Sequence, residues 1–95
     1  MRVVYLAGAA RDMQWLRHYY QRVFPAGAAN AAQRIRATER LILDHPYAGR
    51  PTGRPDVRRV IVARTPFFLL YRLRDDRIEI LRLVDSRSFD PLLGD

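Results

Sequence analysis

The chain has 95 residues, enough for one domain that buries roughly two thirds of the surface its unfolded form would expose. It contains no cysteine, which excludes disulfides, and no apolar stretch approaches the ~20 residues of a membrane span. The net charge is +7 and all 17 basic residues are arginine, which excludes any mechanism that needs a lysine amine. We therefore expect a single domain over residues 1–95, located in the cytoplasm.

The first half of the chain predicts a short strand followed by a helical hairpin. Residues 3–7 are apolar and β-branched, which predicts a strand. From residue 9 to residue 24 apolar side chains recur every three or four positions, as in a helix, and Pro25 ends that helix. A second helix is predicted over residues 28–44. Its alanine-rich first half predicts a close approach to the first helix, and the short connection makes the two helices antiparallel neighbours.

A loop and another strand are predicted next. Residues 46–55 contain three prolines and two glycines, a composition typical of a loop. Residues 57–63 are predicted to form a strand. Because side chains alternate along a strand, Arg58 and Arg59 are expected to face opposite sides of the sheet.

The most apolar part of the chain predicts a β-hairpin. Residues 67–74 and 77–84 are predicted to pair across a two-residue turn at Asp75 and Asp76. Aspartate tolerates the left-handed backbone conformation that such a tight turn demands. The short run 67–71 also suits a buried helix segment, because periodicity alone does not separate the two.

These elements occur in the order β-α-α-β-β-β. The fold class is therefore α+β, with a helical hairpin packed on one face of a mainly antiparallel four-stranded sheet. Residues 91–95 are expected to fray. A single helical layer leaves the other sheet face uncovered, and the run 67–71 is apolar on both sides. We therefore expect exposed apolar area on that face, a feature typical of a partner site.

No set of side chains predicts catalysis, a cofactor or a metal site. His18 and His45 fall in separate helices, with no cysteine or spaced carboxylate pair beside them. Residues 49–53 lack the Gly-Lys-Ser/Thr ending of a phosphate loop. A triad of either histidine with Ser86 or Ser88 has no supporting signal. We expect no catalytic residue, no metal and no cofactor.

The placement of arginine is the remaining functional signal. Residues 50–64 contain a single acid, Asp56, and five arginines: Arg50, Arg54, Arg58, Arg59 and Arg64. This density suits either a solvated loop with a charged edge strand or a surface that grips phosphate or carboxylate. The all-arginine composition also has two interpretations, a coding bias and an acidic partner, either nucleic acid or an acidic protein segment. Arg87, just beyond the last strand, is the one further arginine that we assign to such a surface.

Several segments together carry a resemblance to a known family. They are DMQWLR at 12–17 with Tyr19 and Tyr20, HPYAGRP at 45–51, VRRV at 57–60, PFFLLYR at 66–72 and DRIEILR at 76–82. In this order and spacing they resemble the RelE/ParE superfamily, the toxic halves of bacterial type II toxin–antitoxin modules. The resemblance covers nearly the whole chain and implies the β-α-α-β-β-β order given above.

The superfamily contains two kinds of toxin. RelE-like members cut messenger RNA on the ribosome with basic residues and a tyrosine, histidine or glutamate, whereas ParE-like members poison DNA gyrase and have no known catalytic set. This chain has Phe68 where the nucleases carry an arginine. Asp85, Phe89 or Leu93 stands where they carry a C-terminal histidine or tyrosine, and Arg87 alone matches a nuclease arginine. The resemblance therefore implies the ParE branch.

The resemblance implies a toxin that inhibits DNA gyrase without a cofactor and is neutralised by a cognate ParD-like antitoxin in a hetero-oligomer. Two alternatives remain, a ribosome-dependent endoribonuclease with an arginine-only site and an inactive co-repressor. Arg58, Arg59 and Arg87 are predicted to bind the target. The antitoxin is expected to contribute an acidic segment, disordered alone, that folds on the toxin as a helix or an added strand. Trp15 and Tyr19 are predicted to anchor it, with core packing as the other explanation.

Overall fold

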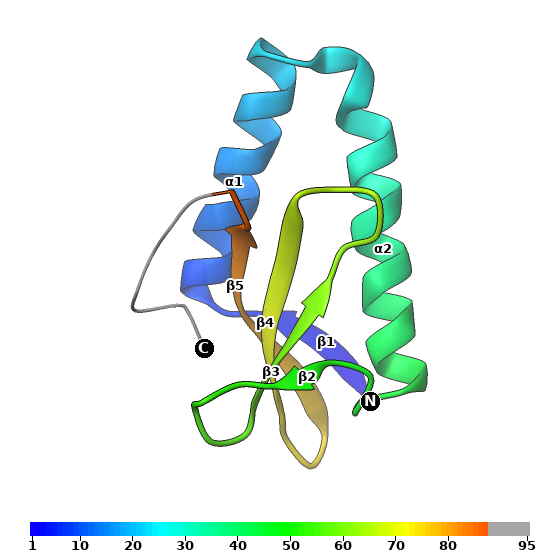
Figure 1. Ribbon diagram of the computed structural model, residues 1–95, viewed down its shortest axis with the longest axis vertical. Helices are drawn as coiled ribbons and strands as arrows, with labels where there is room; N and C mark the ends of the chain where they lie inside the picture. Colours follow the sequence, from blue (N-terminus) through cyan, green and yellow to red (C-terminus); the bar gives the residue numbers. More distant parts are fainter. Residues whose placement is uncertain (88–95) are drawn as a thin grey trace.

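The computed structural model describes residues 1–87 and has two layers, a helical hairpin and a sheet (Figure 1). The helices are α1 (Ala7–Arg22) and α2 (Ala28–Asp44), joined by a 3₁₀ turn, η1 (Pro25–Gly27). The strands are β1 (Arg2–Tyr5), β2 (Arg50–Pro51), β3 (Val57–Ile61), β4 (Phe67–Leu73) and β5 (Arg77–Asp85). The predicted fraying tail, residues 91–95, lies outside the described residues, as do Phe89 and Leu93.

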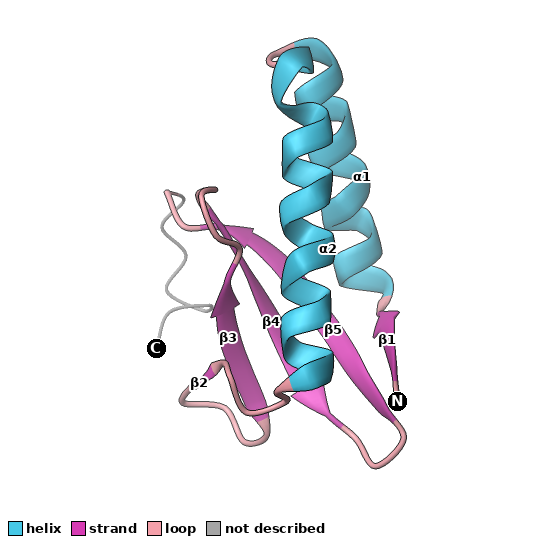
Figure 2. Cartoon of the chain, turned by 90° about the vertical axis from the view of Figure 1, so that its right-hand side faces the viewer, coloured by secondary structure: helices cyan, strands magenta, loops and turns pink. Residues whose placement is uncertain are grey.

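The strands form one mixed sheet in the order β1-β5-β4-β3-β2. β1 runs parallel to β5, and every other neighbouring pair is antiparallel. Both helices pack on the same face of this sheet (Figure 2), so the predicted α+β class is confirmed. The predicted count of four strands is wrong, because Arg50 and Pro51 of the expected loop pair with Arg59 and Arg58 as the fifth strand.

The hairpin of β4 and β5 is confirmed, but its turn differs from the prediction. The Arg74 N–H donates to the Arg77 carbonyl at 2.9 Å and closes the turn. Neither Asp75 nor Asp76 adopts a positive φ, so the expected left-handed turn is wrong. Asp76 acts through its side chain instead, since its carboxylate accepts a hydrogen bond from the Arg77 guanidinium at 2.7 Å.

The first helix begins at Ala7 rather than at residue 9, because Gly8 is part of the helix and does not delay its start. The Ala10 N–H donates to the Leu6 carbonyl at 2.9 Å, so Gly8 lies inside the first turn. A Cβ atom at Gly8 would lie 3.1 Å from Arg82 Cδ. The glycine therefore allows α1 to approach β5 closely, which local propensity does not reveal.

One carboxylate ties α1 to the sheet. Asp12 accepts hydrogen bonds from Arg82 Nε at 2.7 Å and from Arg82 Nη2 at 3.2 Å. It also accepts from the backbone N–H of Leu83 at 2.9 Å, where β5 has passed the end of β1 and has no strand on that side. Asp12 therefore satisfies a backbone donor that would otherwise lack a partner.

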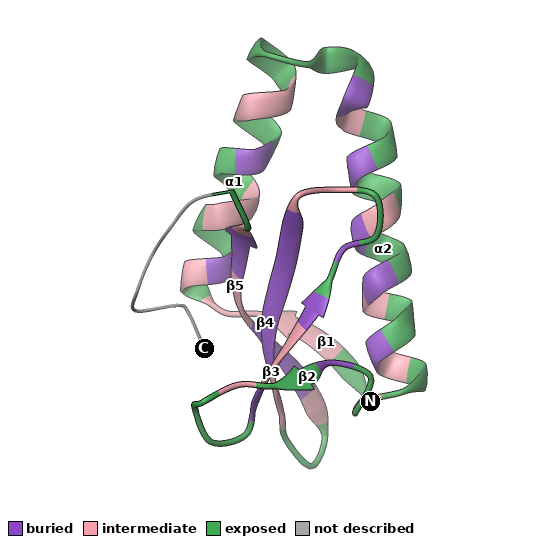
Figure 3. Ribbon diagram, viewed as in Figure 1, coloured by how far each residue is buried: buried purple, intermediate pink, exposed green. Residues whose placement is uncertain are grey.

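The main core lies between the two layers, and most of β4, from Phe67 to Tyr71, is buried (Figure 3). The helices contribute Ala9, Leu16, Ile35 and Ile42, and the sheet side contributes Val60, Val62, Phe67, Leu69, Tyr71, Ile78, Ile80 and Leu83. These side chains are apolar at helical spacing on one layer and at alternate strand positions on the other. Their burial fixes the face on which the helices pack.

A second apolar cluster lies on the sheet face away from the helices. It consists of Val57, Phe68, Leu70 and Val84, each at most 9% exposed. The expectation that residues 67–71 expose apolar area on this face is therefore wrong. The side chains cover one another, Leu81 packs against them, and the Arg59 guanidinium lies over the Phe68 ring. On this face Ile61, opposite Phe68, is a large exposed apolar side chain, and others occur at Trp15, Val23 and Phe24 of the helical hairpin.

Candidate functional site

Arg58 is held by the loop that precedes β2. Its Nη1 donates to the Gly49 carbonyl at 2.7 Å, and its guanidinium carbon lies 4.9 Å from the centre of the Tyr47 ring. Gly49 is in turn held by Tyr71, whose hydroxyl accepts a hydrogen bond from the Gly49 N–H at 2.9 Å and donates to the Pro46 carbonyl at 2.8 Å. Burial raises the pKa of Tyr71, so its hydroxyl stays protonated and able to donate. The orientation of Arg58 is therefore set by the buried core.

Glycine is required in this loop. A Cβ atom at Gly49 would lie 2.6 Å from the Tyr71 ring and 2.9 Å from the Arg59 carbonyl. The loop can pass between the tyrosine and β3 only without a side chain at this position. Tyr71 therefore joins the 45–51 segment to the apolar 66–72 segment.

Arg59 faces the opposite side of the sheet from Arg58, as the alternation along β3 predicts. Its guanidinium carbon lies 5.4 Å from the centre of the Phe68 ring, within the range of a cation–π contact. The two neighbouring arginines therefore belong to different surfaces.

Arg87 lies at the other end of the sheet. Its Nε and Nη2 donate to the two carboxylate oxygens of Asp85 at 3.0 and 2.8 Å. This grip lowers the pKa of Asp85 and raises that of Arg87. In the sheet Arg58 of β3 lies opposite Tyr71 of β4, and Tyr71 lies opposite Ile80 of β5. Asp85 lies roughly 15 Å beyond Ile80 along β5. The structure therefore does not bring Arg58, Arg59 and Arg87 together.

Aromatic side chains form a row along α1. Trp15 and Tyr19 stack with ring centres 5.5 Å apart, Tyr20 meets Tyr19 edge to face at 5.3 Å, and Phe24 follows Tyr20 at 6.3 Å. Trp15 is 52% exposed, so core packing does not explain it. After Asp85, an interaction with the Tyr19 side chain is among the causes that raise the pKa of Arg87, so Arg87 lies near this aromatic row.

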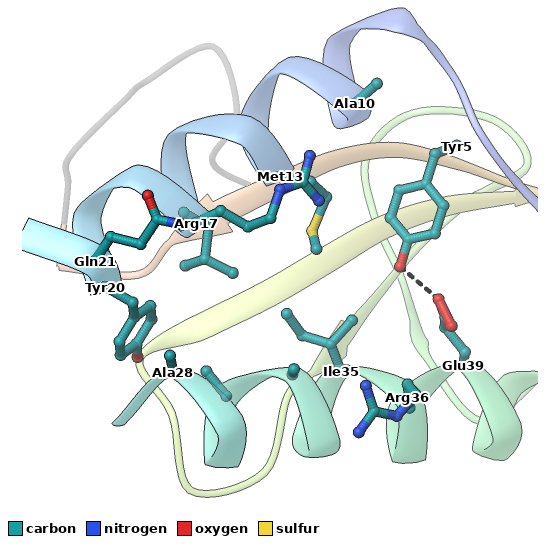
Figure 4. A pocket seen from close by; sticks show the side chains of 13 residues that line it. Tyr5, Ala10, Met13, Arg17, Tyr20, Gln21, Ala28, Ile35, Arg36 and Glu39 are labelled. Carbon is teal, nitrogen blue, oxygen red and sulfur yellow. Dashed lines mark hydrogen bonds between the residues drawn. The ribbon is translucent and has the colours of Figure 1, made fainter. Parts of the chain in front are cut away.

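A groove of about 600 Å³ separates α1 from α2 (Figure 4). Its lining is mainly apolar, with polar groups at the rims: Tyr5, Ala10, Met13, Leu16, Arg17, Tyr20, Gln21, Ala28, Ala31, Ala32, Ile35, Arg36 and Glu39. Trp15 and Tyr19 do not line it. The Tyr5 hydroxyl donates to Glu39 at 2.7 Å, and burial followed by the Glu39 carboxylate raises the pKa of Tyr5.

The groove corrects one prediction. The alanines of α2 were expected to let the helices approach closely, but Ala28, Ala31 and Ala32 line open space instead. Each helix packs on the sheet through larger side chains, such as Leu16 and Ile35, and the small residues between them leave a gap. The alanine pattern of α2 is the sequence signal of this groove, because here small side chains mark a gap between the helices and not a close contact.

The described residues hold no arrangement that points to a metal or a membrane. In residues 1–87 no three histidine, aspartate or glutamate side chains gather as a metal site would require. His18 lies on α1 and His45 follows α2, and both are exposed. No helix in the described part of the chain is both long and apolar enough to cross a membrane.

Comparison with known proteins gives one family. The family model described as the ParE toxin of the type II toxin–antitoxin system parDE matches residues 3–89. Among solved structures, a chain of the chromosomal ParDE toxin–antitoxin system from P. aeruginosa is similar, with 30% sequence identity and a TM-score of 0.75. The match covers 90% of this chain and 95% of that one. No curated protein matches. The chain therefore belongs to the ParE family of type II toxin–antitoxin toxins.

Proposed function

We propose that this ParE-family chain inhibits DNA gyrase. The observation that supports the proposal is the family match over residues 3–89, combined with the residue at position 68. RelE-like nucleases carry an arginine there, and this chain has Phe68, 9% exposed and covered by the Arg59 guanidinium. A phenyl ring neither transfers a proton nor stabilises charge on a phosphate. Inhibition by binding, without cleavage of RNA, fits this site best.

Arg58 is the target contact that the geometry favours most. Its hydrogen bond to the Gly49 carbonyl and its position over Tyr47 fix the guanidinium, while its other donors are not used in these contacts. A guanidinium that is already oriented loses less side-chain freedom when it binds a carboxylate or a phosphate. Because Arg59 and Arg87 lie on other surfaces, each of the three arginines should be tested by itself.

The experiment compares two targets directly. The purified protein is added to a gyrase supercoiling and DNA-cleavage assay and, separately, to a ribosome-dependent translation reaction in which messenger RNA cleavage is monitored. We expect inhibition of gyrase with intact messages. The variant Arg58→Gln should inhibit at least tenfold less strongly, whereas Arg40→Gln, at an exposed position of α2, should inhibit like the parent. Cleaved messages with unaffected gyrase would show that the nuclease alternative is correct.

Membership of the ParE family implies an antitoxin partner, and we propose that part of this antitoxin occupies the groove between α1 and α2. The groove has an apolar floor that includes Met13, Leu16 and Ile35, with Arg17 on one rim and Arg36 on the other (Figure 4). An amphipathic helix with an acidic polar face fits both features, because its apolar side chains fill the floor and its carboxylates meet the arginines. The aromatic row with Trp15 and Tyr19 would extend this contact along α1.

Filling the groove tests the antitoxin proposal. Ala32 is exposed and lines the groove, so Ala32→Trp should block it without disturbing the core. The control is Ala37→Trp, at an exposed α2 position outside the groove. We expect Ala32→Trp to weaken binding of the neighbouring gene's product at least tenfold in calorimetry, and Ala37→Trp to bind normally. Normal binding by Ala32→Trp would place the antitoxin elsewhere.

A further inference from the structure

Each strand of the sheet places one arginine on the face away from the helices. The backbone pairing defines this arginine row: Arg50 of β2, Arg59 of β3, Arg72 of β4, Arg77 of β5 and Arg2 of β1. Arg2, Arg59, Arg72 and Arg77 alternate with the core-facing residues of their own strands. Arg50 lies directly opposite Arg59 and therefore faces the same side of the sheet. The sequence conceals this row, because its members come from five separate segments.

The row crosses the sheet at regular intervals. Arg50 lies directly opposite Arg59, and Arg2 lies directly opposite Arg77. Arg72 is diagonal to Arg59 on one side and to Arg77 on the other. Direct partners lie about 5 Å apart and diagonal ones about 7–8 Å apart, so the row extends roughly 25 Å. A nucleic-acid strand carries one phosphate per about 3.4 Å of axis, so the row offers roughly one guanidinium for every two phosphates.

A single carboxylate fixes the middle of the row. Arg72 donates to Glu79 from Nε at 3.0 Å and from Nη2 at 2.8 Å, and Arg77 Nη2 lies 3.1 Å from the other carboxylate oxygen. The Arg72 and Arg77 side chains remain 30% and 35% exposed, whereas that of Glu79 is only 8% exposed. Hydrogen bonds from Arg72, followed by those from Arg77, lower the pKa of Glu79 and keep it charged. Asp76 also binds Arg77, so two carboxylates offset the two central arginines, while Arg2 and Arg50 at the ends of the row have no carboxylate partner among the described residues.

We infer that the arginine row binds the phosphate backbone of nucleic acid without reading its sequence. The alternative partner, an acidic protein segment, normally needs an apolar interface core as well. Next to the row Val57, Phe68 and Leu70 are each at most 9% exposed, and Ile61, at 70% exposed, is a single apolar side chain rather than such a core. Nucleic acid needs no such core, because release of counterions from the phosphates supplies the affinity. This inference is independent of the proposed inhibition of gyrase.

The test measures how binding depends on salt. Three fluorescein-labelled probes of about 20 nucleotides are used, single-stranded DNA, single-stranded RNA and duplex DNA, with anisotropy recorded between about 50 and 200 mM salt. Each phosphate that the row neutralises adds about −0.7 to the slope of log K against log salt for a single strand and about −0.9 for a duplex, so the two end arginines alone predict about −1.4 or −1.8. The probe that binds with such a slope identifies the kind of nucleic acid.

Paired variants show whether the row is responsible. Arg2→Gln with Arg50→Gln removes its two exposed end members, and Arg11→Gln with Arg40→Gln removes the same charge from exposed positions of the helices. We expect the first pair to weaken binding at least tenfold at low salt and to flatten the slope by about 1.4–1.8, and the second to change affinity less than threefold. Equal losses in the two pairs would overturn the inference. So would binding of a polyglutamate peptide, dependent on the row, with no binding of any oligonucleotide.

The same variants separate this inference from the proposed function. If the double variant Arg2→Gln with Arg50→Gln loses oligonucleotide binding and still inhibits gyrase, that result supports the arginine row as a separate nucleic-acid site. Oligonucleotide binding that depends on the row, in a protein that does not inhibit gyrase, supports the row and refutes the proposed function alone.

Discussion

Replacing Tyr71 with phenylalanine is expected to destabilise the protein strongly, although it removes a single atom. Tyr71 is fully buried, and its hydroxyl is the partner of both the Gly49 N–H and the Pro46 carbonyl. In Tyr71→Phe the ring still fills the core, so the apolar contribution is unchanged. The two loop groups lose their hydrogen bonds, and each net bond contributes about 1 kcal/mol. The buried N–H adds a desolvation cost of about 1–3 kcal/mol, so we expect a loss of at least about 3 kcal/mol in total.

Urea denaturation at equilibrium measures this loss. The midpoint should fall while the slope stays constant, because the surface exposed on unfolding is unchanged. In a domain of this size about 3 kcal/mol corresponds to a fall in Tm of roughly 12–24 °C. Tyr47→Phe is the matched control, since Tyr47 is 72% exposed and the change should alter stability by less than about 0.5 kcal/mol. A loss below about 1 kcal/mol in Tyr71→Phe would refute the argument that its hydroxyl holds the loop.

Three further outcomes follow from other contacts. Asp12→Ala should lower the free energy of unfolding by about 2 kcal/mol in urea melts, because it leaves the part-buried Leu83 N–H of β5 without this acceptor. Arg82→Ala should cost less, because the Arg82 side chain is 44% exposed and Asp12 still accepts from Leu83. Arg64→Gly should keep or raise Tm, unlike Arg64→Ala, because Arg64 has a φ of 62° that only glycine adopts without strain. Glu79 has a lowered pKa, so its contribution to stability is present above the pKa of the unfolded state and is lost as the pH falls below about 4. Glu79→Gln should therefore flatten the acid limb of stability against pH, and an unchanged limb would contradict the role of Arg72 as its main partner.

The elements that the sequence predicted correctly are those whose signal is local. A few turns of sequence are enough to show the apolar periodicity of α1 and α2, and a few residues are enough to show the apolar run of β4. β2 was missed because a two-residue strand carries no pattern of its own and exists only through pairing with β3. The start of α1 was missed for a similar reason, since Gly8 is explained by its proximity to Arg82 of β5 and not by local propensity.

The candidate site was predictable only in part. Sequence alone identified Arg58 and Arg59 as residues on opposite faces, because alternation along a strand is strict. It grouped Arg87 with them, although the antiparallel register of β4 and β5 places Arg87 at the far end of the sheet. The arginine row was beyond prediction, since its membership depends on the register of four strand pairs and on the extra residue that interrupts β5 opposite Leu70 and Tyr71.

The parallel pairing of β1 with β5 has a consequence for how the toxin is made. Arg2 of β1 lies opposite Arg77 of β5, so β1 leaves the ribosome first but has no neighbouring strand until β5 has been synthesised. Contacts this distant in sequence form slowly, because nearly the whole chain must close as a loop. Until β5 has been synthesised, the helical hairpin has only part of its sheet to pack against, and Asp12 lacks the residues that it binds. We therefore expect a polypeptide that stops before residue 77 to remain unfolded and without toxic activity, although it contains β1, both helices and the first strands of the sheet.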